Sequence, residues 1–522
     1  MLRPTLPVRL ALAVAAGLAL WLAFPDHDLW WLAPVGVALL AAATLSATVG
    51  HAFLVGLVGG LAFFVPVLSW SGTYVGALPW LALATLQALY VAAMCAVVGY
   101  AGRRLLDAGR RTAALACVPL GWVAQELARG TTPWGGFPWA RLAFSQADSP
   151  LAHVAAWLGA PGVTAAVATA GAGLLGLATA LRPVAPRRLA GGAAAATLPL
   201  LAGAVPVATD GRAVEVGMVQ GNVPRAGLEF NAERRAVLDN HVRGTEALAA
   251  RAPDDLSLVV WPENASDIDP LRNLDAAAQV QRAVDAVGVP VLVGAVLAEP
   301  PGRDSNVSLL YRPGRGEPER YTKLHPAPFA EWIPFRSFFR NFSGAVDLAG
   351  DFVAGTEVGS FRIEAEGGAY WALPTICFEV AYDGLVRDAV REHPGDDALL
   401  VVQTNNATFG RTAESEQQFA ISRIRAIEHG RSVAHVSTVG VSGLVLPDGS
   451  VVGKTGLFTV EQVLARPVLR SGTTPADRLG RAPELLAVVA LAALTVLAQR
   501  SRRPARVGEP AARRTTEDAP VG

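Results

Sequence analysis

The chain has 522 residues, of which 52% are hydrophobic and only 17% are charged. Because soluble proteins carry about 25% charged residues, this composition excludes an ordinary soluble protein of this length. The 44 basic and 44 acidic residues balance, which gives no basis for a nucleic-acid partner, and three cysteines leave an odd count that forms no disulfide framework.

Residues 1–209 are expected to form a membrane region with seven spans. No Asp, Glu, Lys or Arg occurs between residues 29 and 102, a stretch long enough for three spans of about 20 residues each. The short apolar run after the basic start also fits a signal peptide, but we interpret it as a retained span. The predicted spans are 10–24, 29–46, 51–69, 78–101, 112–125, 149–181 and 189–209.

The character of the chain changes after residue 209. Residues 210–482 are charged, alternating and turn-rich, as expected of a soluble domain. An apolar run at 483–500 predicts an eighth span, and residues 501–522 form a basic tail whose composition predicts disorder.

Arginine clusters predict the orientation in the membrane. With eight spans, all four clusters fall on one side, which the positive-inside rule places in the cytoplasm. Both termini are then cytoplasmic, and the soluble domain faces outward. The clusters are Arg3 with Arg9, Arg103 to Arg111, Arg182 to Arg188, and Arg500 to Arg506.

One outward loop, between residues 126 and 150, is rich in aromatic side chains. It carries Trp134, Phe137 and Trp139. The simplest interpretation of aromatic residues at a membrane edge is an aromatic belt. The functional alternative is a loop that contacts a lipid headgroup or covers a site.

Residues 210–482 alternate apolar strands with helices, which predicts a sheet covered by helices. Sites in open α/β sheets lie at the carboxyl ends of strands. Glu263, Cys377 and Asn405 each follow an apolar strand closely. The predicted strands are 214–219, 256–261, 289–296, 306–311, 369–376, 398–404 and 432–437, and the predicted helices are 232–251 and 273–287.

Cys377 is the candidate nucleophile. Cys95 and Cys117 lie inside apolar runs, where a thiol packs as a small hydrophobe, whereas Cys377 lies among polar and titratable residues. A cysteine that attacks an acyl group needs a base for its proton and a cation or donor for the oxyanion, and Glu263 and Lys323 can supply these. Taken singly, each residue has a plainer interpretation. Cys377 is then a structural cysteine, Glu263 a helix cap and Lys323 a solvated surface charge.

Together these residues resemble a known arrangement. Glu263 in Trp-Pro-Glu, Lys323 in Tyr-Thr-Lys and Cys377 in Ile-Cys-Phe-Glu have the order and spacing of the Glu-Lys-Cys triad of the carbon-nitrogen hydrolase (nitrilase) superfamily. The resemblance implies an α-β-β-α sandwich for residues 210–482. With eight flanking spans, the whole chain resembles the membrane branch of that superfamily, the apolipoprotein N-acyltransferases. Further matches are 218–224, 137–139 and 328–334.

The resemblance implies a two-step acyl exchange. Glu263 would take the thiol proton, and Cys377 would attack the sn-1 ester of a phospholipid such as phosphatidylethanolamine to form a thioester. The α-amine of a diacylglyceryl-cysteine at the N-terminus of a lipoprotein would then attack this thioester. Lys323 and the backbone N–H of Phe378 would hold the oxyanion.

Further site residues follow from the resemblance alone. Glu331 matches a glutamate that orients the lysine, and Glu379 matches a further acidic position. Phe137, Trp139 and Phe230 match lipid-contacting aromatic positions, although relatives often have tryptophan near Phe230 and tyrosine at the position of Phe378.

The resemblance also implies the surroundings in which the protein works. The expected partners are a phospholipid acyl donor and diacylglyceryl-modified lipoproteins, with no metal, no cofactor and no nucleic acid. The protein is expected to be a monomer in the plasma membrane of a bacterium, with an extracytoplasmic catalytic domain.

Three other interpretations compete with this one. A membrane-tethered amidase or nitrilase acting on a small amide would share the triad, but it would not require seven spans. A transporter is disfavoured because its spans should contain charged residues along a pathway, and spans two to four contain none. A catalytically dead scaffold would not require all of Glu263, Lys323 and Cys377.

Overall fold

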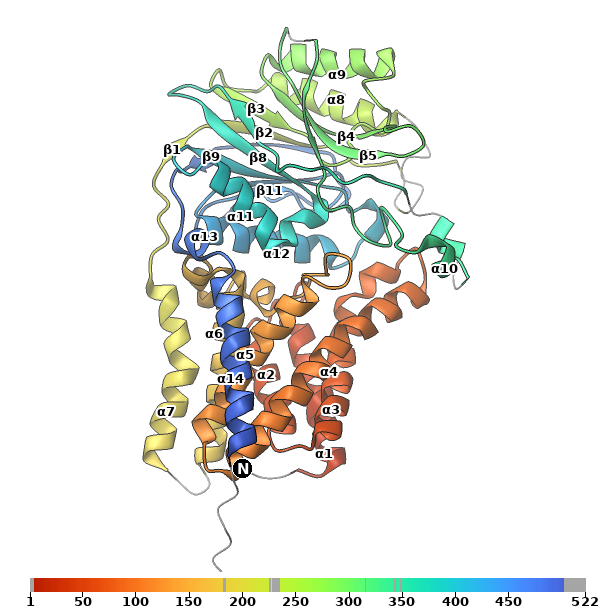
Figure 1. Cartoon of the computed structure of the whole chain (residues 1–522). Coiled ribbons are helices and arrows are strands. Elements are labelled where there is room, and N and C mark those ends of the chain that lie inside the picture. The colour runs from red at the N-terminus through yellow and green to blue at the C-terminus, as the bar shows by residue number, and fades with distance from the viewer. Residues whose placement is uncertain are drawn as a thin grey trace, which may run out of the picture.

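The protein consists of a helical bundle with an α/β domain stacked on one end of it, as the computed structural model in Figure 1 shows. The structure describes residues 4–181, 185–224, 227, 235–314, 316–341, 344–347 and 350–501. Phe230 and the basic tail from residue 502 onward lie outside the described residues. Within them, the predicted combination of an apolar helical region and a sandwich of two sheets is confirmed.

A helix lies in each of the eight apolar segments that the sequence indicates. Among the residues that the structure describes, four segments are long and apolar enough to cross a membrane, and these hold α3, α4, α6 and α14. The helices α1 and α2 are apolar but shorter, so the count of eight crossings stays a prediction. The bundle consists of α1 (Leu6–Leu22), α2 (Leu32–Thr44), α3 (Val49–Val67), α4 (Ala77–Asp107), α5 (Arg111–Arg129), α6 (Ala155–Ala180), α7 (Pro186–Thr197) and α14 (Ala482–Arg500).

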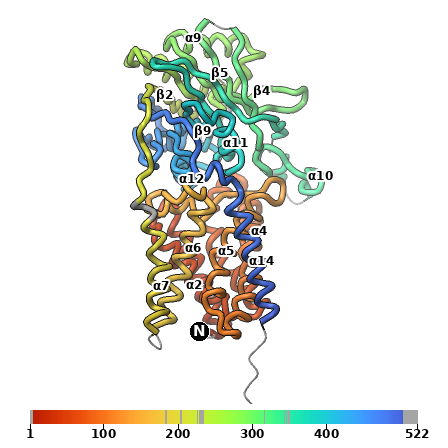
Figure 2. The backbone as a smooth tube through the Cα atoms, turned by 60° about the vertical axis from the view of Figure 1, so that its left-hand side comes forward, coloured from red at the N-terminus to blue at the C-terminus, as the bar shows by residue number. Residues whose placement is uncertain are grey.

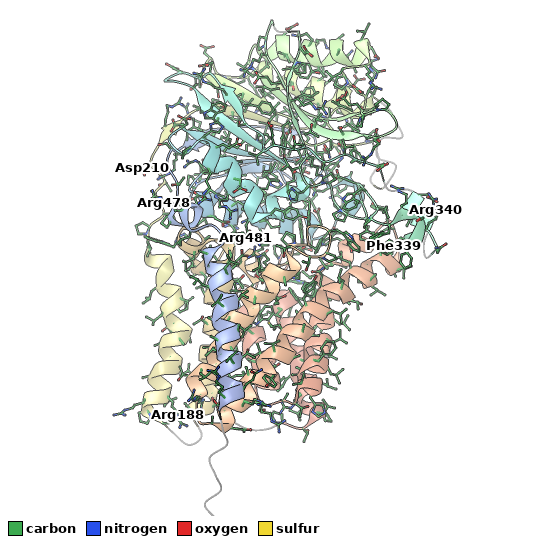
Figure 3. The ribbon with its side chains drawn as sticks, viewed as in Figure 1. Arg188, Asp210, Phe339, Arg340, Arg478 and Arg481 are labelled. Atoms are coloured by element: carbon green, nitrogen blue, oxygen red, sulfur yellow. The ribbon has the colours of Figure 1, made fainter. Side chains whose placement is uncertain are left out.

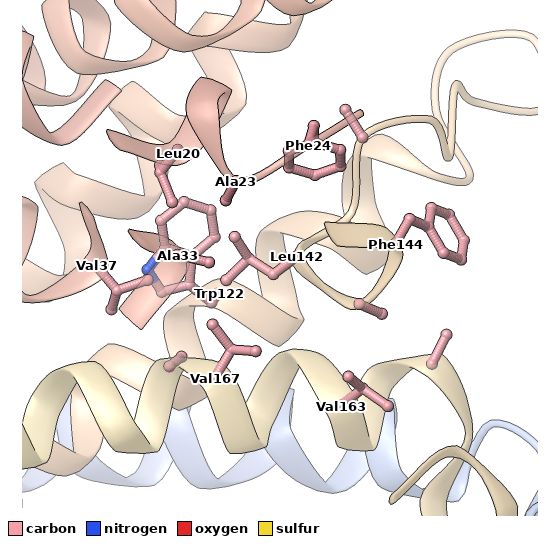
Figure 4. Packing of buried hydrophobic residues seen from close by; sticks show 14 of the residues in the cluster. Leu20, Ala23, Phe24, Ala33, Val37, Trp122, Leu142, Phe144, Val163 and Val167 are labelled. Atoms are coloured by element: carbon pink, nitrogen blue, oxygen red, sulfur yellow. The ribbon is translucent and has the colours of Figure 1, made fainter. Parts of the chain in front are cut away.

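Small residues let the bundle helices pack backbone against backbone. A Cβ added at Gly56 of α3 would lie 2.7 Å from the Cα of Ala92 on α4, closer than packed carbon atoms can approach. Larger side chains fill the space where helices diverge, and Figure 4 shows Trp122 among Leu20, Val37 and Val167. Figure 2 shows α14 running alongside α4 and α5, so the last helix closes the bundle.

The described part of the α/β domain contains two six-stranded sheets. In the first sheet the strand order is β13-β2-β3-β4-β5-β6, and in the second it is β12-β11-β10-β9-β8-β7. The first comprises β2 (Glu215–Gln220), β3 (Leu256–Val260), β4 (Val291–Leu297), β5 (Ser305–Tyr311), β6 (Glu319–Thr322) and β13 (Glu461–Ala465). The second comprises β7 (Phe361–Ile363), β8 (Tyr370–Ile376), β9 (Ala398–Thr404), β10 (Val433–Ser437), β11 (Gly443–Val445) and β12 (Val451–Val452). A short pair joins β1 (Arg212–Ala213) to β14 (Val468–Leu469).

The two sheets pack face to face, and helices cover both outer faces. An apolar core that includes Met218, Val260, Leu399 and Val401 lies between the sheets. On one side lie α8 (Ala236–Ala249) and α9 (Leu274–Val287), and on the other lie α11 (Asp383–Glu392) and α12 (Glu414–His429). This is the expected α-β-β-α order, and α11 and α12 form the layer between the sheets and the bundle (Figure 1).

A buried ionic network joins this layer to the bundle. Arg141, which follows the aromatic loop, forms ion pairs with Glu126 of α5, Asp383 of α11 and Glu484 of α14. Asp383 also pairs with Arg425 of α12. A buried charge that loses its partner is strongly destabilising, so these pairs hold the α/β domain in a fixed position on the helices.

Candidate active site

The three candidate catalytic residues lie where strands end. Glu263 follows β3, Lys323 follows β6 directly, and Cys377 follows β8 directly. Gly294 of β4 makes room for the turn before Glu263, because a Cβ there would lie 2.2 Å from the Pro262 carbonyl oxygen. Two of the strands belong to one sheet and the third to the other, so the site lies at the seam between the sheets.

Lys323 lies at the centre of a buried cluster. Its Nζ donates to Oε1 of Glu263 at 3.2 Å and to Glu331 at 2.9 Å, and only 2% of the residue is exposed. Asn306 donates to both carboxylates, at 2.7 Å to Glu263 and 2.9 Å to Glu331. The backbone N–H of Ala327 donates to the other oxygen of Glu331 at 2.7 Å. Lysine and both glutamates are therefore fixed in position.

The charges of this cluster determine its protonation. Burial lowers the pKa of Lys323, but the carboxylates of Glu263 and Glu331 outweigh burial and hold that pKa well above its ordinary value. Burial raises the pKa of Glu263, an effect that the Lys323 charge opposes. The lysine therefore stays a cation that can stabilise an oxyanion, and Glu263 is a stronger proton acceptor than an exposed glutamate.

Cys377 occupies a strained position at the end of β8. Its backbone φ is 55°, in the left-handed region that non-glycine residues rarely adopt, and it begins the short turn η6 (Cys377–Ala381). Burial raises the pKa of its thiol, and the Glu263 charge raises it further, while Lys323 lowers it. The resting residue is a neutral thiol, so it requires a base in order to react.

Glu379 connects the cysteine segment to the lysine segment. It is fully buried, and its Oε1 accepts from the backbone N–H groups of Leu324 at 2.7 Å and His325 at 3.0 Å. Its Oε2 accepts from the Tyr321 hydroxyl at 2.9 Å and the Ile376 N–H at 2.8 Å. One carboxylate thus fixes the residues after Lys323 against the residue before Cys377.

The aromatic loop of the bundle reaches this site. The rings of Trp139 and Phe137 stack on the ring of Phe378, with centroid distances of 5.5 Å and 5.3 Å. The indole N–H of Trp139 donates to Gln417 at 2.8 Å, and the residue is 1% exposed. The aromatic-belt interpretation is therefore wrong for Trp139, which lies inside the protein beside the cysteine turn. Lipid contact by Phe137 and Trp139 stays a prediction, and Phe230 lies outside the described residues.

Trp139→Phe tests the expectation, taken from the family resemblance, that this loop serves a lipid substrate. Phenylalanine keeps a ring against Phe378 but loses the hydrogen bond to Gln417 and part of the stacked surface. We expect a several-fold larger loss of rate with a phospholipid donor than with a short soluble ester, measured as release of the donor alcohol from each. Equal losses with both donors would show that Trp139 only supports the fold.

Sequence reasoning missed two polar residues of the site. Asn306 lies within β5 and Gln418 within α12, and both are buried. Neither follows a strand end nor stands in a motif, so only the folded chain brings them beside Glu263 and Cys377. Asn405, which does follow a strand, accepts from the backbone N–H of Ala407 at 3.0 Å and so stabilises its own turn.

Comparisons with known proteins agree with this architecture. Residues 16–173 match the Apolipoprotein N-acyltransferase N-terminal domain, and residues 215–473 match the Carbon-nitrogen hydrolase domain.

Three similar relatives are named Apolipoprotein N-acyltransferase. The relative from Mycolicibacterium smegmatis is 39% identical over 94% of this chain and 84% of its own length. The one from Ralstonia nicotianae is 32% identical over 94% of this chain and 93% of its own length. The one from Photobacterium profundum is 29% identical over 91% of this chain and 92% of its own length. With both regions matched in order and nearly the whole length aligned, the chain belongs to the apolipoprotein N-acyltransferase family.

Proposed function

We propose that this protein transfers a fatty acyl group from a membrane phospholipid, through a thioester on Cys377, to the α-amine of the N-terminal diacylglyceryl-cysteine of lipoproteins. Membership of the family supports lipoprotein N-acylation. The observation that carries the mechanism is the position of Cys377. It starts a turn whose next residue, Phe378, stacks on the aromatic loop of the bundle, and it lies beside the buried Lys323–Glu263 pair.

In the first step Glu263 takes the proton of the Cys377 thiol, and Sγ attacks the ester carbonyl carbon. Lys323 stabilises the oxyanion that forms, together with the backbone N–H of Phe378. When the tetrahedral intermediate collapses, the ester C–O bond breaks and the alkoxide leaves as a lysophospholipid with the proton that Glu263 held. The acyl group stays on sulfur as a thioester.

In the second step the lipoprotein amine attacks the thioester carbonyl. Lys323 again holds the oxyanion, and Glu263 takes the proton that the amine loses. The C–S bond then breaks, an amide forms, and the cysteine sulfur regains its proton from Glu263. Because the thioester retains the reactivity of the ester, no external energy source is required, and burial of the site protects the thioester from water.

A transfer assay tests this function against the amidase alternative. The purified protein in detergent receives phosphatidylethanolamine and a diacylglyceryl-cysteine peptide, and mass spectrometry follows both products. We expect one N-acyl peptide for each lysophospholipid released. Hydrolysis of small amides without peptide acylation would favour the amidase. Cys117→Ser serves as a matched control, since this thiol is fully buried in the bundle and should leave the rate unchanged.

The chain is a bacterial membrane protein, as its family and its long apolar helices indicate. We propose seven spans before the catalytic domain, an eighth after it, both termini in the cytoplasm, and the catalytic domain outside. The support is the placement of charge: Figure 3 shows Arg188 at the end of the bundle far from the catalytic domain. We also propose that a monomer suffices, because Glu263, Lys323 and Cys377 come from one chain.

Cysteine labelling in intact cells tests the orientation. Ser450→Cys places an exposed thiol on the catalytic domain, and Arg110→Cys places one between α4 and α5. In a Cys377→Ala background, an impermeant maleimide should label position 450 in intact cells and position 110 only after the cells are opened. The reverse pattern would invert the proposed topology. Cys95 and Cys117 are buried and should stay unlabelled.

A further inference from the structure

The sulfur of Cys377 has a hydrogen-bond donor outside the Glu-Lys-Cys set. Gln418 of α12 is fully buried, and its Nε2 donates to Sγ at 3.7 Å, within range for a bond to sulfur. Lys323 and Glu263 bind each other in this structure at 3.2 Å. The amide of Gln418 therefore contacts the reacting atom, while the triad cation lies on the neighbouring carboxylates.

The orientation of the Gln418 amide follows from a chain of hydrogen bonds. It begins at the backbone N–H of Gly440, which can only donate and does so to Oγ of Ser437 at 2.8 Å. The Ser437 hydroxyl then donates to Oδ1 of Asn406. With its oxygen engaged, Asn406 directs its NH₂ group to Oε1 of Gln418 at 2.9 Å. In this network Gln418 presents its own NH₂ group to the sulfur.

Two further groups support this arrangement. The Thr404 hydroxyl lies 2.8 Å from Oε1 of Gln418 and donates to it. The same hydroxyl is near enough to Cys377 to lower the pKa of its thiol by hydrogen bonding. The second N–H of Asn406 donates to Glu414 at 2.7 Å. Burial raises the pKa of Glu414 to about 8, and the hydrogen bond from Asn406 opposes this shift. When Glu414 is charged, it raises the pKa of the Cys377 thiol.

We propose that Gln418 is a catalytic residue that stabilises negative charge on the Cys377 sulfur through its amide N–H. It would act when the thiol gives its proton to Glu263, and again when the sulfur leaves during attack by the amine. This proposal rests on the proposed role of Cys377 as nucleophile. It divides the work between two donors: Lys323 stabilises the oxyanion on the carbonyl, and Gln418 stabilises the sulfur.

Gln418→Met tests the proposal, because methionine has a similar length and shape but no N–H. The readout is the rate of Cys377 alkylation by iodoacetamide from pH 6 to pH 11, followed by peptide mass spectrometry on the full-length protein. Because a hydrogen bond to the thiolate lowers the thiol pKa, its loss should slow alkylation roughly tenfold below that pKa. Because burial already raises the thiol pKa, the rate should still be rising at pH 11, and the Gln418→Met profile should be displaced to higher pH.

Two other variants complete the design. Gln418→Asn keeps the amide but withdraws it by one methylene, so it should shift the profile in the same direction even if the methionine variant fails to fold. Ser422→Ala is the matched control, because Ser422 is also buried on α12 but bonds His435 at 2.8 Å instead of the sulfur. The alkylation profile of Ser422→Ala should match that of the unmodified protein.

Two results would overturn the proposal. One is an unchanged alkylation profile in both Gln418 variants. The other is a shifted profile in Thr404→Val with none in Gln418→Met, which would make the Thr404 hydroxyl the donor to sulfur. Alkylation needs neither phospholipid nor lipoprotein, so this test can fail or succeed independently of the transfer assay.

Discussion

Cys377→Ser is expected to abolish acyl transfer, although it exchanges a single atom. The reference pKa of a thiol is near 8.5, whereas an alcohol has a far higher pKa, so a carboxylate base can deprotonate cysteine in the transition state but not serine. The site already opposes charge on the nucleophile, because burial raises the pKa of the thiol. Any acyl group that did reach serine would form an oxygen ester, which an amine attacks more slowly than a thioester.

The other two cysteines provide matched controls for this variant. Cys95 and Cys117 lie in α4 and α5 and are at most 1% exposed, so their thiols act as packing groups. Complementation of a depleted strain should succeed with Cys95→Ser and Cys117→Ser and fail with Cys377→Ser. Full activity in Cys377→Ser, or a loss confined to either control, would remove Cys377 from the reaction.

Glu263→Gln is expected to slow thioester formation by roughly 10²–10⁴-fold, the usual contribution of a general base. The amide oxygen of glutamine can still accept the hydrogen bonds that Asn306 and Lys323 donate to Oε1 of Glu263, so the fold should persist. What glutamine cannot do is accept the thiol proton. The measurement is the burst of lysophospholipid released before the lipoprotein peptide is added.

A surface substitution separates this effect from a general change of charge. Glu416→Gln also removes one carboxylate, but Glu416 is partly exposed on α12 and pairs with Lys454 at 2.9 Å. Its burst should equal that of the unmodified protein. A normal burst in Glu263→Gln would mean that Glu263 only holds Lys323 in place and that another group takes the proton.

The sequence carried enough information to predict the fold and the ends of the catalytic strands. An apolar strand pattern can be recognised from residues that are neighbours in the sequence. The strands β3, β8 and β9 lie where these patterns predicted them. Glu263 and Cys377 follow such strands, so each could be placed at a strand end. Since β3 and β8 belong to different sheets, only the resemblance to the Glu-Lys-Cys triad predicted that the two residues meet. The helix expected up to residue 209 changes form and ends earlier, since α7 stops at Thr197 and the 3-10 helix η4 (Leu198–Ala204) follows it.

Contacts between distant parts of the chain could not be predicted in this way. Trp139 stacks on Phe378, more than 200 residues later, and its burial depends on how the catalytic domain sits on the bundle. Glu379 matched an acidic position in the motif, but its function as a link between two loops becomes visible only when Leu324 and Ile376 are placed beside it. Gln418 approaches the sulfur because α12 packs against β10 and the cysteine turn η6.

The measurement that tests the central claim most directly is the mass of the protein as it is purified from its membrane. If Cys377 carries the acyl group between the two substrates, part of the protein should be heavier by one fatty acyl chain. The added mass should map to the peptide that contains Cys377 and disappear after treatment with neutral hydroxylamine or with a diacylglyceryl-cysteine peptide. An acyl group on any other residue, or full transfer activity in Cys377→Ala, would contradict the account.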